Sequence, residues 1–313
     1  MIYLNKKQIL DMVSMTEAIN AMESAFVELS KGNVIAPNRL SMDFPNKNAT
    51  SLIMPAYITG NPYYCVKTVS INYSNPQKGL PLIHSSVQVF DASRGNQIAT
   101  LDGVSITAIR TAAASALATK LMSKKNAMVC AIFGTGVQAS FHVKSIMKVR
   151  KIKKFIVFSR NKKTAAKFCD LHSKQIKCEI GYQETLKKAD IICTTTPSEH
   201  PLIKFSDIRS GSHLNVIGSH QPMMREVSTD IVSQSKVIVD QIKACKKEAG
   251  DLIIPMEEGQ WSFKQVHAEL GQVVAGELPK RESDNEITLF KSVGNAVQDL
   301  AMVNLLLKKL KYD

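Results

Sequence analysis

The sequence predicts an α/β protein with two domains, one built on a parallel sheet and one on a mainly antiparallel sheet. Three observations support this prediction. Residues 127–240 alternate short apolar strands with helices, the rhythm of a parallel sheet covered by helices on both faces. Residues 50–92 instead hold β-branched or alternating runs separated by Asn, Pro and Gly turns, which is typical of antiparallel strands. The length of 313 residues leaves room for both domains.

The first domain is predicted to combine helices with this antiparallel sheet. Helical periodicity runs over residues 8–30 and ends before Gly32, a C-terminal cap. Three strands and an Ala-rich helix follow, at 50–57, 63–71, 84–92 and 104–122. The amphipathic segment 287–313 lies outside the strand–helix rhythm, and we expect it to return as one long helix. The predicted domains are therefore 1–122 completed by 287–313, and 123–286.

The high positive charge does not by itself indicate a nucleic-acid partner. The formal net charge is +13, and the lysines are scattered in pairs over predicted helices and loops. A nucleic-acid binder would concentrate its cations on one face, often with aromatic residues between them, and only 6% of the residues here are aromatic. We interpret the charge as a solvated basic surface that favours anionic ligands, and we expect no nucleic-acid partner.

Cysteine spacing and apolar runs bear on the compartment. The six cysteines form no C-x-x-C pair, and several lie in apolar strand-like runs, so we interpret them as buried thiols of a reducing compartment. This predicts neither disulfides nor a metal site. The N-terminal residues lack the apolar core of a signal peptide, and no apolar run approaches the ~20 residues of a membrane span. We expect a cytoplasmic protein without a membrane partner.

A glycine-rich turn in the stretch "AIFGTGVQASFHV", residues 131–143, predicts a dinucleotide site. An apolar strand precedes the turn and a helix follows it, which is the required context for this motif. Gly134 allows the tight turn, Gly136 lets the backbone approach a pyrophosphate, and Ala139 allows close packing of helix on strand. The phosphates would lie at the helix N-terminus. The alternative is a glycine turn in an unrelated α/β domain.

The end of the next strand bears on which dinucleotide would bind. NAD-dependent enzymes usually place a carboxylate there for the ribose hydroxyls, whereas this chain has "FSRNKKT", with Ser159, Arg160 and Asn161. An arginine can pair with a 2′-phosphate through two hydrogen bonds and stack on adenine. We therefore predict NADPH as the cofactor, with NADH possible. The alternative is that Arg160 is a surface residue at a helix start.

Several motifs, in order along almost the whole chain, resemble the ornithine cyclodeaminase/mu-crystallin family. They are "IMPAY", "LDGVSITAIRTAAASALATKLM", "IFGTGVQA", "ADIICTTTPSEHPLI", "GSHLNVIGSHQPMMREV" and "ITLFKSVGNAVQD". The resemblance implies a Rossmann-type NADP(H)-binding second domain and an α+β first domain that supplies the substrate pocket and the contacts of a homodimer. It also implies an oxidoreductase acting on small α-amino or α-imino carboxylates.

By this resemblance, Arg39, Lys67 and Arg110 match the cations that bind the substrate carboxylate in the family. A carboxylate in a partly dry pocket needs opposed cations, and an arginine can bind both of its oxygens. Arg110 is a lone charge in a helix of apolar and small residues, and Lys67 lies on an apolar strand, so both are expected to point inward. Taken alone, each cation is also compatible with a surface position.

Further residues are assigned through the resemblance. Substrate contact is assigned to His84, and cofactor contacts to Ser86, Thr111, Val137, Gln138, Thr195, Thr196 and Gly218. Asp102 and Glu269 match acidic family positions, where they would either order Arg110 or cap helices, and we favour a structural role. Three more carboxylates are interpreted as structural: Asp299 as a charge on a helix face, and Glu248 and Asp251 as a helix terminus.

One departure from the family pattern bears on the reaction. In "GSHQP", residues 218–222, His220 stands where ornithine cyclodeaminases have the aspartate that acts on the substrate amine and water. Histidine can shuttle protons, but this change and Arg160 both favour imine reduction. We therefore predict an NAD(P)H-dependent ketimine reductase that forms proline or pipecolate from the cyclic imine, with Lys67 or a water near His220 as proton donor. The alternatives are an ornithine cyclodeaminase, an alanine dehydrogenase-like enzyme, and a non-catalytic protein that binds NADPH and a small ligand.

Overall fold

The computed structural model describes residues 1–312 and contains two compact units. The first comprises residues 1–110 and the segment from Asn295 onward, and the second comprises residues 111–294. The limits expected at 122/123 and 286/287 are thus displaced to 110/111 and 294/295. The first of these limits falls inside a helix, α3 (Gly103–Met122).

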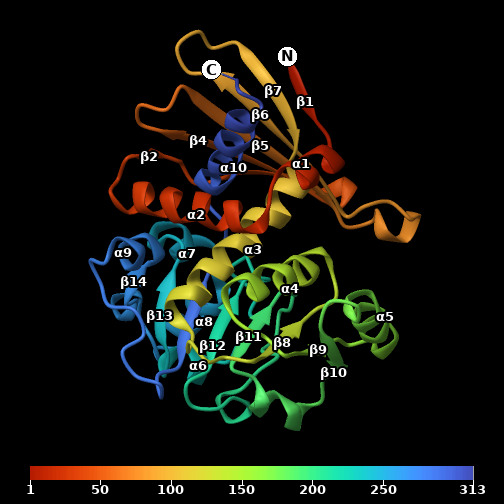
Figure 1. Ribbon diagram of the computed structural model, residues 1–313, viewed down its shortest axis with the longest axis vertical. Coiled ribbons are helices and arrows are strands. Elements are labelled where there is room, and N and C mark those ends of the chain that lie inside the picture. Colours follow the sequence, from red (N-terminus) through yellow and green to blue (C-terminus); the bar gives the residue numbers. More distant parts are fainter. Residues whose placement is uncertain (313) are drawn as a thin grey trace. The chain divides into compact units, whose positions relative to one another are not determined.

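The first unit is a mixed sheet with helices. In chain order it contains β1 (Ile2–Leu4), α1 (Lys6–Met12), α2 (Met15–Ser30), β2 (Val34–Ile35), β3 (Leu40–Phe44), β4 (Ala49–Ile58), β5 (Tyr63–Asn72), β6 (Ile83–Asp91), β7 (Gln97–Asp102), the start of α3, and α10 (Ala296–Lys309). The strand order is β1-β7-β6-β5-β4-β2, with β3 also paired to β4 (Figure 1). Among the described strands of this first unit, β1 and β7 form the one parallel pair, and the other pairs are antiparallel. The predicted antiparallel strands are confirmed as β4, β5 and β6.

Helices α2 and α10 pack against each other, and α10 also packs on β4 and β5 (Figure 1). A capping box of Ser14 and Glu17 begins α2, whose buried residues recur at helical spacing and include Met22 and Phe26. Oε1 of Glu17 also forms an ion pair with Nζ of Lys309 in α10, at a distance of 2.6 Å. The two helices are therefore joined by apolar burial and by one surface ion pair.

The second unit is an all-parallel sheet with helices between the strands. It contains β8 (Val129–Phe133), α4 (Val137–Val149), β9 (Lys154–Phe158), α5 (Lys162–His172), β10 (Lys177–Ile180), β11 (Ile191–Thr194), β12 (His213–Val216), α6 (Thr229–Ser233), β13 (Lys236–Val239), α7 (Ile242–Glu248), α8 (Gly250–Glu257), β14 (Ala268–Glu269), α9 (Leu270–Ala275) and β15 (Thr288–Lys291). The strand order is β10-β9-β8-β11-β12-β15-β13-β14. Its first five strands have the order of a Rossmann-type sheet, so the predicted fold class is confirmed.

Two predicted helices differ in the structure. The sequence predicts one helix over 287–313, but Thr288–Lys291 form β15 between β12 and β13, and α10 begins only at Ala296. Thr288 and its neighbours form a short apolar run, which periodicity alone cannot assign to strand or helix. The helix expected near residue 185 is a 3₁₀ helix, Gln183–Lys188.

The interior of the second unit is apolar on both sides of its sheet. One cluster of buried residues includes Leu214, Val237 and Leu289, and the other includes Ile132, Val143 and Phe155. Cys130, Cys193 and Cys245 are buried here, whereas Cys169 and Cys178 are only partly buried. Over residues 1–312, none of the helices has both the length and the apolar character needed to cross a membrane.

Candidate functional site

The buried cations of the first unit gather around one carboxylate. Lys67 of β5 lies with its Nζ 2.7 Å from Oδ2 of Asp299 in α10, and Arg110 of α3 has its Nε 3.4 Å from Oδ1. Strand alternation places Lys67 on the same buried face of β5 as Cys65. Lys67 is 1% exposed and Arg110 is 6% exposed, so the prediction that both point inward is confirmed.

Arg110 is oriented by a second residue of α10. Its Nη1 donates to Oε1 of Gln298 at 2.8 Å, and the same oxygen accepts from the backbone N of Asn295 at 3.0 Å. Asn295 and Gln298 form the capping box of α10, so the cap of this helix fixes the guanidinium. We call Lys67, Arg110, Gln298 and Asp299 the cation cluster.

Burial lowers the pKa of Lys67 from 10.5 to about 8, although the negative charge of Asp299 opposes this shift. The positive charges of Arg110 and Arg39 lower the pKa of Lys67 further. Arg39 is partly buried and directly precedes β3. Lys67 therefore interacts with two further cations, and Asp299 is the carboxylate that is buried beside Lys67 and Arg110. An excess of positive charge in a dry environment fits an anionic ligand such as a carboxylate.

The acidic residues singled out from the sequence differ in what they contact. Asp102 accepts from the backbone N of Ser105 at 2.8 Å at the start of α3, and Glu269 accepts from the backbone N of Ile242 at 2.8 Å at the start of α7. Both carboxylates thus satisfy backbone N–H groups at helix starts, in line with the structural role favoured from the sequence. The interpretation of Asp299 as a helix-face charge is wrong, because its carboxylate is fully buried between Lys67 and Arg110.

The remaining substrate-side predictions fall on β6 and α3. His84 is exposed near the start of β6, and Ser86 is partly buried and lies opposite Thr68 of β5 in the sheet register. Thr111 is buried in α3 and belongs to the second unit. Of the predicted catalytic residues, the structure thus brings together Lys67 and Arg110 within the first unit.

The glycine turn lies between β8 and α4. Gly134 has a φ of +106°, and a Cβ there would lie 2.7 Å from Oγ1 of Thr195, so no other residue fits without strain. Gly136 is the N-cap of α4, without a side-chain cap, and the space where its Cβ would stand is open. Val137 is exposed and Gln138 is partly buried in the first turn of α4. An uncapped helix N-terminus beside open space suits a phosphate group.

The turn after β9 holds the three residues predicted to select the dinucleotide. Oγ of Ser159 accepts from the backbone N of Asn161 at 3.3 Å, and Oδ1 of Asn161 caps α5 by accepting from Lys163 N at 2.9 Å. Both side chains are therefore engaged in the turn. Arg160 lies between them and is exposed. Its guanidinium is the cationic group that this turn presents to solvent.

The loops that follow β11 and β12 meet at the carboxylate of Glu226. Its Oε1 accepts from the backbone N and Oγ1 of Thr196, and its Oε2 accepts from Oγ1 of Thr194 and from the backbone N of Gly218, each at 2.7 Å. Burial, together with the charge of Asp251, raises the pKa of Glu226. Thr195 donates from Oγ1 to Phe133 O at 2.8 Å. These loops lie at the carboxyl ends of parallel strands, where ligands of such sheets bind.

A second buried ion pair holds the loop that carries His220. Nζ of Lys291, at the end of β15, donates to Oδ2 of Asp251 at 2.7 Å and to the backbone O of Ser219 at 2.6 Å. Asp251 also accepts from the backbone N of Glu226 at 2.6 Å and from the hydroxyl of Ser219. We call Ser219, Glu226, Asp251 and Lys291 the loop cluster. Asp251 does begin a helix, as expected, but as a buried ion-pair partner and not as a terminal charge.

The predicted cofactor residues of the second unit fit a dinucleotide. Gly134 and Gly136 provide the turn and the open helix N-terminus, and Arg160 provides an exposed cation at the end of the next strand. Thr195, Thr196 and Gly218 lie on the loops at the carboxyl edge of the same sheet. These are the positions that a Rossmann-type domain uses for pyrophosphate, ribose and nicotinamide.

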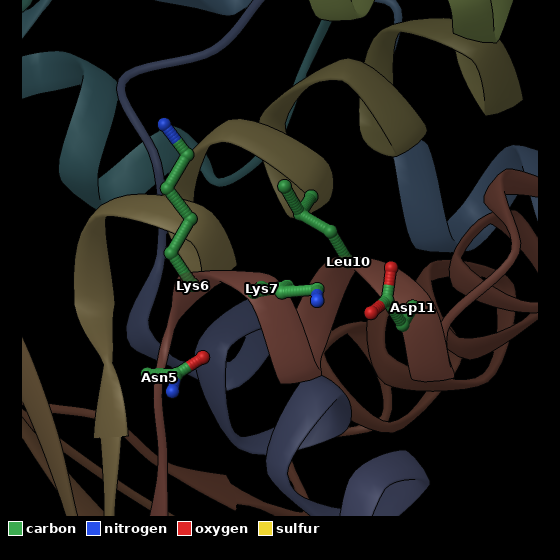
Figure 2. Close-up of a pocket in the computed structure, with 5 residues that line it drawn as sticks. All are labelled: Asn5, Lys6, Lys7, Leu10 and Asp11. Atoms are coloured by element: carbon green, nitrogen blue, oxygen red, sulfur yellow. The ribbon is translucent and has the colours of Figure 1, made fainter.

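A surface hollow of the first unit lies apart from these residues. It has a volume of about 460 Å³ and is lined by Asn5, Lys6, Lys7, Leu10 and Asp11. Figure 2 shows these side chains on and next to α1, and all five residues are exposed. Because none of the residues assigned to substrate or cofactor lines it, we assign it no part in the site.

The whole chain matches one family model. The model of the ornithine cyclodeaminase/mu-crystallin family covers residues 2–312. The chain belongs to this family. The resemblance noted from the sequence motifs is therefore confirmed over the full length.

Three known proteins are similar to this chain over nearly their whole length. The Delta(1)-pyrroline-2-carboxylate reductase of Bacillus cereus is 37% identical, over 99% of this chain and 96% of that protein. The structure of the Thermococcus litoralis Delta(1)-pyrroline-2-carboxylate reductase in complex with NADH and L-proline is 37% identical, with a TM-score of 0.95 over 99% and 98% of the two chains. An archaeal alanine dehydrogenase dimer with bound NAD is 30% identical, with a TM-score of 0.93 over 99% and 96%.

Within this family member, inspection of the sequence missed three buried charges, Glu226, Lys291 and Asp299. Each pairs with residues far away in the chain, so local spacing carried no signal for the pairing. A weak signal did exist for Lys291, which follows the apolar strand residues of "ITLF" directly. A charge at the end of such a buried strand usually has a partner.

Proposed function

We infer that this chain is a nicotinamide-dependent reductase of cyclic imino acids, which converts 1-pyrroline-2-carboxylate or 1-piperideine-2-carboxylate into L-proline or L-pipecolate. The observation that carries this proposal is the buried cation cluster in a chain similar over its full length to pyrroline-2-carboxylate reductases. The cluster suits a small acid, and these relatives reduce a small cyclic imino acid, according to their names.

The substrate carboxylate is proposed to bind Arg110, Lys67 and Arg39. Arg110 offers a planar fork whose orientation Gln298 fixes, which suits two parallel hydrogen bonds to a carboxylate. Lys67 adds a compact charge, held by Asp299. His84 is proposed to contact the substrate from β6. Binding of the carboxylate orients the ring, and positioning of this kind can supply most of the acceleration.

The cofactor is proposed to bind the second unit. When bound, it supplies the hydride that reduces the C=N bond. Gly134, Gly136, Val137 and Gln138 would hold the pyrophosphate at the start of α4. Ser159, Arg160 and Asn161 would hold the adenosine end, with Arg160 on a 2′-phosphate, so NADPH is preferred over NADH. The other proposed contacts are Ser86, Thr111, Thr195, Thr196 and Gly218.

The reaction also needs one proton on the imine nitrogen. Lys67 has a pKa of about 8, close to the operating range of a general acid at neutral pH. It remains largely protonated at pH 7 and can donate a proton as well as pair with the carboxylate. His220 is the second proposed donor, acting through a water. Its Nδ1 lies 3.3 Å from the backbone O of Gly218.

Two other reactions of the family are the competing candidates. The similarity to an alanine dehydrogenase favours reductive amination of pyruvate as the second candidate. Cyclodeamination of ornithine is disfavoured, because His220 replaces the acidic group that the resemblance associates with that reaction. A protein that binds NADPH and a small acid without turnover is the remaining alternative.

The assembly is proposed to be a homodimer formed through the first unit. The sheet face that carries Tyr64 and Phe90, whose rings stack 4.9 Å apart, is opposite the face of Lys67. An apolar hollow of about 500 Å³ lies there, lined by Ile35, Pro37, Pro55, Ala56, Tyr57, Tyr64 and Ala92. Nearby β3 exposes Leu40, Met42 and Phe44. An apolar surface of this kind is typical of a subunit interface, and sedimentation velocity measures the oligomeric state.

The decisive experiment measures NADPH and NADH oxidation with each candidate substrate. We expect rapid oxidation with 1-pyrroline-2-carboxylate or 1-piperideine-2-carboxylate, a lower KM for NADPH than for NADH, and slow oxidation with pyruvate plus ammonia. Faster turnover of pyruvate plus ammonia would instead identify an amino-acid dehydrogenase. Ammonia release from ornithine without added reductant would identify a cyclodeaminase. NADPH binding without turnover of any imine would identify a binding protein.

A further inference from the structure

The loop cluster uses buried charges that the proposed reaction does not consume. Glu226, Asp251 and Lys291 are each 0% exposed. Burial of three charges destabilises the folded state unless the charges are paired, and apolar residues of the same volume would often make it at least as stable. Their hydrogen-bond partners do not come from all parts of the core. They are the backbone and hydroxyl groups of the two loops that follow β11 and β12.

We propose that Glu226 is a positioning residue of the cofactor site, whose buried carboxylate joins the loop after β11 to the loop after β12 and fixes both for the dinucleotide. This proposal rests on the proposed function, because Thr195, Thr196 and Gly218 are cofactor contacts in it. Asp251 and Lys291 support the same loops from behind.

The geometry of the carboxylate supports this role. Oε1 faces the backbone N–H of Thr196 in the first loop, and Oε2 faces the backbone N–H of Gly218 in the second. A backbone N–H can only donate, so each oxygen must accept. Glutamine in this place has one accepting atom and one NH₂ group. Whichever way the amide turns, one loop then has its N–H facing another donor.

The two loops have little room to adjust. A Cβ on Gly218 would lie 2.1 Å from the backbone N of Thr196, so the loops are in direct contact there. A Cβ on Gly250 would lie 2.1 Å from the backbone O of Met224, so the second loop is also in contact with the start of α8. Packing this tight transmits a shift of the Glu226 side chain to both loops.

Lys291 and Asp251 fix the remaining part of the second loop. Lys291 Nζ donates to the backbone O of Ser219, the residue between Gly218 and His220. Asp251 Oδ1 accepts from the backbone N of Glu226 and of Val227, at 2.6 and 3.1 Å. The loop is therefore held by hydrogen bonds at its start and at its end. This explains why the network contains charges: only charged groups provide this many acceptors and donors at one buried place.

The test compares Glu226→Gln with Glu258→Gln in the full-length protein. Glu258 belongs to the same unit, but its carboxylate accepts from the side chains of Arg225 and Thr229, which can rotate to suit an amide. We expect Glu226→Gln to raise the Kd for NADPH, measured by fluorescence titration, at least about tenfold, the effect of one lost hydrogen bond to a charged group. Glu258→Gln should bind NADPH within about twofold of the unaltered protein, a difference of a few tenths of a kcal/mol. Circular dichroism and Tm check that both variants are folded.

A second variant covers the case in which Glu226→Gln does not fold. Thr194→Val removes one buried hydroxyl donor to Oε2 and keeps the shape of the side chain. We expect it to weaken NADPH binding about threefold to tenfold, the effect of about 0.7–1.4 kcal/mol. A lowered Tm with an unchanged Kd in the folded variants would overturn the proposal and leave Glu226 a purely structural residue.

The test of Glu226 can be distinguished from the test of the proposed function. If the unaltered protein binds NADPH but reduces no imine, the proposed function fails while the Kd comparison still decides the role of Glu226. If the unaltered protein binds neither NADPH nor NADH, the positioning role is overturned as well. Imine turnover with a normal Kd in Glu226→Gln would overturn the positioning role alone.

Discussion

The cation cluster and the loop cluster are both buried and charged, but they differ in how fully their groups are paired. In the loop cluster, each carboxylate oxygen of Glu226 accepts two hydrogen bonds, and Lys291 donates to Asp251 and to Ser219. In the cation cluster, Asp299 has one close partner, at 2.7 Å, and one distant partner, at 3.4 Å.

This difference separates a site that supports structure from a site that is ready to bind. A closed network forms no additional hydrogen bonds with a ligand, because all its polar groups already have partners. The cation cluster keeps spare donors: an arginine has five N–H groups and a lysine three, whereas within residues 1–312 two ion pairs with Asp299 and one hydrogen bond to Gln298 engage Arg110 and Lys67. A carboxylate ligand would complete their coordination. The pairing pattern therefore supports the proposed binding role of the first cluster and the proposed supporting role of the second.

The largest effect is expected from Arg110→Lys, which keeps the charge but removes the planar fork. We expect kcat/KM for the cyclic imine to fall at least about a hundredfold, because two hydrogen bonds to a carboxylate contribute about 3 kcal/mol or more together. Part of the change should appear in KM, through weaker binding of the carboxylate, and part in kcat, through poorer orientation of the ring. Steady-state kinetics with saturating NADPH measure it, and Arg94→Lys, in an exposed turn, is the matched control. An unchanged KM would remove Arg110 from the carboxylate site.

The closed network should respond in stability. Lys291→Met leaves Asp251 buried without its cation, and we expect the free energy of unfolding to fall by about 3–5 kcal/mol. Urea denaturation at pH 7 measures this. Lys236→Met is the control, because Lys236 pairs with Glu282 at 2.6 Å near the surface, where such a pair contributes about 1 kcal/mol or less. Equal losses in the two variants would mean that the loop cluster is no more tightly coupled than a surface pair.

The two clusters also show where inspection of the sequence succeeded. Arg110 stood out because it is a lone cation among Ala, Ile and Thr residues, and Lys67 because it interrupts an apolar strand. The glycine turn was recognisable because its strand and helix are adjacent in the chain. In each case the informative residues are close to one another in sequence, so local chemistry was enough to predict an inward position or a turn.

The same reasoning explains the failures. Asp299 lies in "AVQD" on a helix with other polar residues, and its burial depends on Lys67, more than two hundred residues away. Glu226 receives its donors from the ends of two separate strands, β11 and β12, so no spacing rule could identify it. The strand β15 was assigned to a helix because its short run of apolar and β-branched residues is compatible with either structure until neighbouring strands exist. Long-range pairing decides each of these cases.

A smaller effect is expected at the adenosine end of the second unit. Arg160→Ala should raise the KM for NADPH about tenfold and leave the KM for NADH within about twofold, because only NADPH carries the 2′-phosphate that the guanidinium would bind. The expected rise in KM is modest because Arg160 is exposed and its charge is screened by solvent. Lys163→Ala, an exposed cation three residues further on in the first turn of α5, provides a control for the loss of one positive charge. Equal effects on both cofactors would remove Arg160 from the 2′-phosphate site.

The smallest change is expected from Asp299→Asn, and it should appear in the pH profile more than in the rate at neutral pH. The negative charge of Asp299 raises the pKa of Lys67 against the effect of burial. Without it, the pKa of Lys67 falls below about 8, and Lys67 loses its proton at a lower pH. Since protonated Lys67 is proposed to bind the carboxylate and to donate the proton, kcat/KM should be retained at low pH and its decline at alkaline pH should begin earlier than in the unaltered protein. Asp43→Asn, an exposed residue that accepts from Thr50 at 2.8 Å, should leave the profile in place. A profile that does not move in Asp299→Asn would show that a group other than Lys67 controls the alkaline limb, and the open pairing of the cation cluster would then serve binding without proton transfer.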